Sequence, residues 1–309
     1  HTVTRRQRQM CIRDRNYILY HKGSLPDHLF YCINSILSVD DDSKIHLITD
    51  QEVIIPEIEV INTQDYDELE FLETFKNNLK SSGLSSNPLW ITSLERIFFI
   101  NEYLKKSQLS EFVHFDNDVV IYKPFSQIKK YFEKEEKGIF ITPLNLYNLI
   151  FGYSYVNSLE KFDILTNKIR NVAENLKDYQ FKYNKNKVLN EMRILSIISN
   201  ENDGLISELE TLPYGQDDVI FDPASYGQFL GGTHQKPKRF YRINFATQQH
   251  TVGTEIISKR IKTKFVNSTP YVVSELGDKV ELVNLHIHSK ELQKFKPKMY
   301  RHIVNKTTY

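Results

Sequence analysis

The 309-residue sequence is poor in cysteine, has almost no net charge and lacks a long hydrophobic run, and each shortage excludes a class of protein. Two cysteines are too few for the disulfide framework of a small secreted domain. The 40 basic and 39 acidic residues nearly cancel to +1, so no overall field attracts nucleic acid or an anionic membrane. No apolar run approaches the roughly 20 residues that cross a bilayer, and no signal peptide is visible. We therefore expect a cytoplasmic protein, at most peripheral to a membrane, without a transmembrane segment or a nucleic-acid partner.

The first fifteen residues differ from the rest in being basic and without a helical or strand period. Back-translation of Met10 to Asp14 resembles the end of a transposon-based sequencing adapter, and Arg5 to Gln9 fit the adapter bases just upstream. We therefore predict that residues 1–15 are an artefactual tail rather than part of the fold. A basic targeting arm is the alternative.

From Asn16 onwards the sequence alternates short apolar runs with stretches of helical periodicity. With 40% hydrophobic and 12% aromatic residues, the chain is apolar enough and long enough to build one large domain. The alternation predicts an α/β fold, a single domain in which helices flank a mostly parallel sheet. The segment 212–237 is expected to be mostly loop. Strands are expected at 17–20, 45–49, 58–61, 111–115, 138–142, 262–266, 271–273 and 280–288, and helices at 26–39, 65–80, 90–105, 159–179 and 187–198.

Two acidic residues, Asp116 and Asp118, follow directly on the apolar strand that ends at Phe115. Open α/β sheets bind ligands at the carboxyl ends of their strands, so both carboxylates are expected at such an edge. Alternation along a strand would put Asp116 and Asp118 on one side and Asn117 on the other. A divalent cation would remove the repulsion between the two carboxylates and could bridge to the oxygens of a diphosphate. An ordinary turn rich in Asp and Asn is the alternative interpretation.

A second candidate for metal binding lies far along the chain, where His286 and His288 are separated by one residue. In a strand the two side chains point to the same side, so either could reach a metal ion. Mixed oxygen and imidazole ligation suits Mn²⁺, with Mg²⁺ as the alternative. An exposed edge strand with two ordinary histidines would give the same pattern.

The runs 94–100 and 113–125 contain an Arg-bearing helix, an apolar strand, an Asp-x-Asp and a Pro-containing turn. They resemble the central part of GT-A glycosyltransferases, especially those of family 8, and the strand and helix at 17–39 are similar to the nucleotide-binding half of that Rossmann-like fold. The resemblance implies metal-dependent transfer of a sugar from a nucleoside-diphosphate sugar, typically a UDP-sugar, to a hydroxyl of a glycan, lipid-linked or protein-linked acceptor, as in polysaccharide biosynthesis. It implies a nucleotide-sugar-binding half at 16–125 and an acceptor-binding half at 126–309, and it favours retention of the anomeric configuration.

The same resemblance implies roles for individual residues. The metal would be held by Asp116, Asp118 and one of the two late histidines. Lys290 would bind the diphosphate, although it lies closer to the histidines than the family pattern has it, and Lys294 is the alternative. Arg96 would contact the diphosphate or brace Asp116, the alternative being an ordinary solvated or ion-paired helix arginine. The further residues expected to contact the nucleotide-sugar are Tyr20, Asn117, Gly231 and Gly232.

A third region, 221–233, combines glycines with polar side chains. Its glycine pair would let the backbone approach a ligand closely, although the spacing is not that of a phosphate loop of the Walker or dinucleotide type. Asp222 and Gln228 could hydrogen-bond to sugar hydroxyls and are candidate catalytic residues. Glu191 is the third candidate, as a general base facing the acceptor. The plainer alternatives are a glycine-rich surface turn and, for Glu191, a first-turn residue favoured by the helix dipole.

Other functions fit parts of the pattern. A sugar nucleotidyltransferase uses a related sheet and binds metal through carboxylates, but it needs a glycine-rich basic loop after the first strand. Residues 21–26 contain one glycine and one lysine there, so glycosyl transfer is the better interpretation. A non-catalytic carbohydrate-binding protein on the same fold is the second alternative. A metallohydrolase built on the late histidines is the third, and it lacks further clustered histidines.

Overall fold

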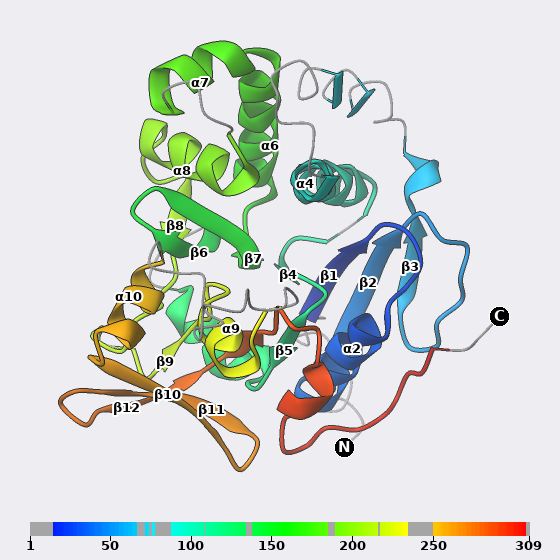
Figure 1. Ribbon diagram of the computed structural model, residues 1–309. Coiled ribbons are helices and arrows are strands. Elements are labelled where there is room, and N and C mark those ends of the chain that lie inside the picture. Colours follow the sequence, from blue (N-terminus) through cyan, green and yellow to red (C-terminus); the bar gives the residue numbers. More distant parts are fainter. Residues whose placement is uncertain are drawn as a thin grey trace, which may run out of the picture.

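The computed structural model describes residues 15–66, 72–73, 76–77, 88–107, 109–133, 138–184, 189–215, 217–233 and 250–306. At its centre lies a seven-stranded sheet in the order β3-β2-β1-β4-β7-β6-β8 (Figure 1). The pairs from β3 to β4 are parallel, β7 is antiparallel to β4 and β6, and β8 is parallel to β6. The predicted α/β class with a mostly parallel sheet is thus confirmed. The strands are β1 (Arg15–His21), β2 (Ser43–Thr49), β3 (Glu59–Asn62), β4 (Phe112–Phe115), β6 (Ile139–Asn145), β7 (Asn148–Val156) and β8 (Ile206–Glu208).

Apolar side chains on both faces of this sheet form two cores. The alternation of β1 supplies both, because Ile18 and Tyr20 pack into the core beneath α4 while Tyr17 and Leu19 pack into the core beneath α2. Helices α4, α6 and α8 therefore cover one face, and α2 with the smaller strands covers the other (Figure 1). The helices are α2 (Asp27–Val39), α4 (Pro88–Lys106), α5 (Phe125–Ile128), α6 (Leu159–Glu174), α7 (Leu176–Asn184), α8 (Glu191–Glu201), α9 (Tyr226–Gly231) and α10 (Thr251–Ile257), with the 3-10 turns η1 (Thr63–Asp65), η2 (Lys129–Tyr131) and η3 (Leu292–Phe295).

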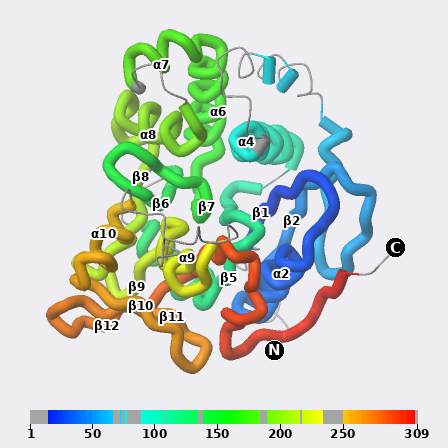
Figure 2. The backbone as a smooth tube through the Cα atoms, in the orientation of Figure 1, coloured from blue at the N-terminus to red at the C-terminus, as the bar shows by residue number. Residues whose placement is uncertain are grey.

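Two smaller sheets complete the second face. One has the order β10-β11-β12-β9, and the other pairs β13 with β5. After η3 the chain runs back past α2 (Figure 2), where the side-chain amide of Asn34 exchanges hydrogen bonds of 2.7 and 2.8 Å with the backbone of Val304. None of the described helices combines the length and the apolarity that a membrane crossing needs. The strands are β5 (Val119–Ile121), β9 (Val219–Ile220), β10 (Ile261–Val266), β11 (Thr269–Ser274), β12 (Lys279–Leu282) and β13 (Asn284–His286).

Several predicted elements differ from the structure in ways that matter for the site. The strand predicted at 280–288 is two strands, because the chain leaves the sheet of β12 at Val283 and joins β5 as β13. The helix predicted at 159–179 breaks at Asn175, where α6 ends and α7 begins. The predicted loop 212–237 contains β9 and α9, and β7 was not predicted. Most of the helix predicted at 65–80 lies outside the described residues.

The chain is described from Arg15, which is the first residue of β1 and pairs with Ser43 of β2. Its guanidinium forms an ion pair with the buried Asp40. Residues 1–14, which make up nearly all of the predicted tail, lie outside the described residues.

Candidate metal and nucleotide-sugar site

The turn between β4 and β5 carries the Asp-x-Asp motif. Strand β4 ends at Phe115, and residues 117 and 118 form a turn closed by a 3.1 Å hydrogen bond from the Val119 amide to the Asp116 carbonyl. The expectation that strand alternation aligns Asp116 and Asp118 is therefore wrong, because these residues are not in a strand. The turn nevertheless brings both carboxylates to one place at the carboxyl end of β4.

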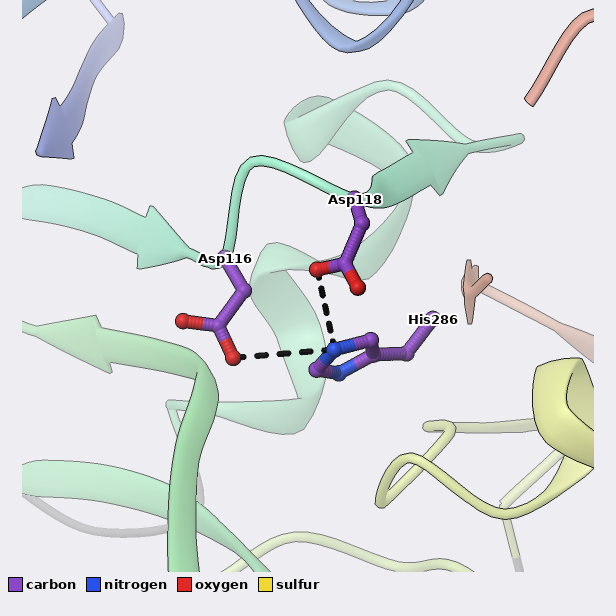
Figure 3. Close-up of side chains that lie close together, drawn as sticks. All are labelled: Asp116, Asp118 and His286. Carbon is purple, nitrogen blue, oxygen red and sulfur yellow. Dashed lines mark ion pairs between the residues drawn. The ribbon is translucent and has the colours of Figure 1, made fainter. Parts of the chain in front are cut away.

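Strand β13 brings an imidazole to the same place from far along the chain. It pairs antiparallel with β5, which sets His286 opposite Val119. Nε2 of His286 lies 3.0 Å from Oδ1 of Asp118 and 3.7 Å from Oδ2 of Asp116. Figure 3 shows the imidazole between the two carboxylates. One ligand atom from each of the three residues lies within 4.8 Å of the others. Sequence reasoning named all three residues, and the sheet pairing explains why they meet.

This group fits a divalent cation. It offers two carboxylate oxygens and one imidazole nitrogen, a set that suits Mn²⁺ and also accommodates Mg²⁺. The side chains of Asp118 and His286 are 5% and 6% exposed, so little water reaches these two ligand candidates. Asp116 is 25% exposed, so the group opens to solvent on that side.

A glycine lies directly against the group. A Cβ on Gly152 of β7 would lie 3.2 Å from Nδ1 of His286 and 3.3 Å from Oδ2 of Asp116. The Gly152 carbonyl also accepts a 3.2 Å hydrogen bond from the Asp116 amide. Sequence reasoning missed this residue, and the available signal was a glycine inside an apolar strand, which marks a close approach.

We expect Gly152→Ala to weaken metal binding about tenfold, because the added methyl presses on both His286 and Asp116. Titration of the purified protein with Mn²⁺ by calorimetry measures the effect. Gly138→Ala is the matched control, because a Cβ there would meet its nearest atom at an ordinary 3.6 Å. Equal Mn²⁺ affinity in the two variants would contradict the prediction.

Arg96 links the Asp-x-Asp motif to α8. Its guanidinium contacts the carboxylate of Asp116 and lies 2.7 Å from Oε1 of Glu191. Burial opposes ionisation of Asp116, but the charges of Arg96 and His286 outweigh it and lower its pKa. Burial raises the pKa of Glu191 in spite of the same arginine. The structure pairs Arg96 with Asp116 and Glu191, an arrangement that both a brace for Asp116 and an ordinary ion-paired arginine would give. Contact with a diphosphate stays a prediction.

Lys290 lies on the other carboxylate. Its ammonium contacts Oδ2 of Asp118, and its side chain is 44% exposed. Burial opposes ionisation of Asp118 as well, yet His286 and Lys290 hold its pKa well below the usual range. Burial also disfavours the imidazolium of His286, but Asp118 and Asp116 together raise its pKa. The site thus keeps both carboxylates ionised.

The second late histidine lies beside the group rather than in it. The rings of His286 and His288 are 4.8 Å apart, but His288 is not one of the three residues whose ligand atoms meet. Strand β13 ends at His286, so the alternation that predicted equivalent positions does not continue. Burial, with the neighbouring His286, lowers the pKa of His288 to about 3. Its buried Nε2 has no hydrogen-bond partner among the described residues.

Asn117 ties the turn to the end of β1. Its side-chain amide donates a 2.8 Å hydrogen bond to the Tyr20 carbonyl and lies 3.0 Å from Nδ1 of His21. The ring of Tyr20 is buried and stacks on Phe99 at 5.8 Å, so Tyr20 faces the turn with its backbone. Contact of Asn117 or Tyr20 with a nucleotide-sugar stays a prediction.

The glycine-rich region packs next to β13. A Cβ on Gly231 would lie 3.2 Å from the ring of Phe295 and 3.3 Å from Ile287, so this glycine allows α9 to approach both. Gly232 follows the last residue of α9 as its C-cap, with a φ of 76° that favours glycine. Gln228 is buried, and its Oε1 has no hydrogen-bond partner among the described residues. Contact of these residues with the donor or a sugar stays a prediction.

Comparison with solved structures finds glycosyltransferases. Mouse xyloside xylosyltransferase 1 in its apo form is 11% identical, with 64% of this chain and 85% of that chain covered at a TM-score of 0.44. The galactosyltransferase LgtC with donor and acceptor sugar analogues is 12% identical, with 63% and 73% covered at 0.39. The PaToxG glycosyltransferase is 10% identical, with 61% and 69% covered at 0.40. The sequence matches no protein-family model and no curated protein. The chain is thus similar in structure to glycosyltransferases, and at these identities the similarity assigns neither substrate nor residue roles.

Proposed function

We propose that this protein is a metal-dependent glycosyltransferase that moves a sugar from a nucleoside-diphosphate sugar, with UDP as the first candidate nucleotide, to a hydroxyl of a glycan, lipid-linked or protein-linked acceptor. The observation that carries the proposal is the meeting of Asp116, Asp118 and His286 at one point. The two elements that meet there, the β4–β5 turn and β13, are separated by about half of the chain.

Each residue of the group has a definite task in this proposal. Asp116, Asp118 and His286 would hold the cation, and the cation when bound would offset the charge on the departing diphosphate. The ammonium of Lys290, which is close to the group and partly exposed, would bind the same diphosphate. Arg96 would keep Asp116 ionised and oriented, with Glu191 holding the guanidinium from its other side.

The remaining assignments follow the two halves of the chain. We assign the nucleotide-sugar to the half at 16–125 and the acceptor to the half at 126–309. Gln228 is the candidate for a hydroxyl contact, because its buried Oε1 lacks a partner among the described residues. The family resemblance favours retention of the anomeric configuration.

A thermal-shift screen of nucleoside diphosphates with and without Mn²⁺ tests the proposal. We expect UDP with Mn²⁺ to raise the melting temperature by about 5 °C at about 100 times its Kd, and UDP with EDTA to raise it far less. Hydrolysis of UDP-sugars then tests turnover. Binding without turnover would indicate a carbohydrate-binding protein, and stabilisation by nucleoside triphosphates instead would indicate a nucleotidyltransferase. Nucleotide binding that is equal in Mn²⁺ and EDTA would overturn the metal-dependent proposal.

A further inference from the structure

A buried carboxylate outside the metal group has all of its acceptor capacity taken by main-chain amides. Asp222, between β9 and α9, is 1% exposed. Its Oδ1 accepts hydrogen bonds from the amides of Ser225 at 2.7 Å and Tyr226 at 2.8 Å. Its Oδ2 accepts from the amides of Gly227 and His286, both at 2.8 Å. A carboxylate offers roughly four lone-pair positions, so none is left for a sugar hydroxyl.

The hydrogen bond to His286 takes the place of a strand neighbour. On one edge β13 pairs with β5, and the next amide, that of Ile287, donates to the Asp118 carbonyl at 2.8 Å. Successive amides of an extended chain point to opposite edges, so the amide of His286 points away from β5. Oδ2 of Asp222 receives it there, and the Asp222 amide in turn donates to Oδ1 of Asn284 at 3.1 Å. Both edges of β13 are therefore fixed at the residue that carries the imidazole.

The start of α9 is pressed against the same residue. A Cβ on Gly227 would lie 2.2 Å from the carbonyl oxygen of His286 and 2.8 Å from its nitrogen. Only a glycine permits this approach, and the approach lets one carboxylate oxygen bind the amides of Gly227 and His286 together. The backbone at His286 is thus held from the side of α9 as well as from β5.

We propose that Asp222 is a positioning residue for the metal site, whose carboxylate fixes the main chain of His286 and so aims the imidazole at Asp116 and Asp118. This role replaces the expected contact between Asp222 and a sugar, and it rests on the proposed binding of a divalent cation by the three-residue group. Changing a partner that orients a metal ligand typically weakens metal binding about 10–100-fold.

Asp222→Asn tests the proposal, because the amide keeps the shape but turns one acceptor oxygen into a donor that faces two of the main-chain amides. We expect the Kd for Mn²⁺, measured by calorimetry without nucleotide, to rise about 10–100-fold. Asp40→Asn is the matched control. Asp40 is fully buried and accepts a 3.0 Å hydrogen bond from the Phe125 amide, but it is not part of the metal group. This control should lower the melting temperature and leave the Kd for Mn²⁺ unchanged.

Asn284→Ala is a milder second variant in case Asp222→Asn does not fold. It removes the acceptor of the Asp222 amide, and we expect the Kd for Mn²⁺ to rise about threefold. In a His286→Ala background, neither substitution should weaken Mn²⁺ binding further, because there is no imidazole left to aim. Lower melting temperatures with a wild-type Kd would reduce Asp222 to a structural residue and overturn the positioning role alone. Absence of Mn²⁺ binding by the unaltered protein would overturn both this role and the proposed function.

Discussion

Asp118→Asn is expected to reduce Mn²⁺-dependent turnover of a nucleotide-sugar by about a thousandfold. The substitution keeps the size of the side chain but removes the charge of the most buried ligand in the group, which His286 and Lys290 both contact. A metal that offsets the charge of a leaving group contributes several kcal/mol to the transition state, and about 4 kcal/mol corresponds to this factor. Release of nucleoside diphosphate from the donor, measured at saturating Mn²⁺, gives the rate.

The fold is expected to survive this change, because Asn still fills the turn and the hydrogen bond that closes it joins main-chain atoms of Asp116 and Val119. Circular dichroism and thermal melting check this point. Asp218→Asn is the matched control, since the side chain of Asp218 is 74% exposed and pairs with Lys130 at the surface. Wild-type turnover by Asp118→Asn, or by the unaltered protein in EDTA, would reject the assignment of the metal group.

The features that the sequence could predict are those that depend on local patterns in short stretches of chain. An apolar run ending in Asp116 and Asp118 marks the carboxyl end of a strand, whatever the rest of the fold does. The same holds for the apolar run of β1 and for the apolar stripe of α2. The late histidines could be proposed because two imidazoles one residue apart would lie on the same side of a strand, and because the family resemblance implies a metal-ligating histidine late in the chain.

The features that could not be predicted depend on pairings between distant segments. Whether His286 or His288 meets the carboxylates depends on where the pairing of β13 with β5 ends. Residues 283–290 alone do not determine the register of this pairing. Gly152 and Gly227 could be noticed as glycines that allow a close approach, but what approaches them is known only when β7 and α9 are placed against His286. Asp222 looked like a loop residue free to bind sugar, because its four main-chain partners come partly from a strand some sixty residues later.

Arg96→Met is expected to lower the free energy of unfolding by about 3–5 kcal/mol, as measured by urea denaturation in EDTA. Methionine fills similar space, but the change leaves the carboxylates of Asp116 and Glu191 near each other without their shared cation. Lys130→Met is the control, because the side chains of Lys130 and its partner Asp218 are 60% and 74% exposed and their pair should contribute at most about 1 kcal/mol.

A second substitution separates lost charge from lost packing. Adding Glu191→Gln to Arg96→Met removes one of the two unpaired charges, and we expect it to restore about half of the lost stability. Mn²⁺ should also stabilise Arg96→Met more than the wild type, because the cation compensates the charge of Asp116 that the arginine no longer offsets. If the double variant is no more stable than Arg96→Met, and Mn²⁺ stabilises both proteins equally, Arg96 acts through packing, and its role as the charge that keeps Asp116 ready for the metal is wrong.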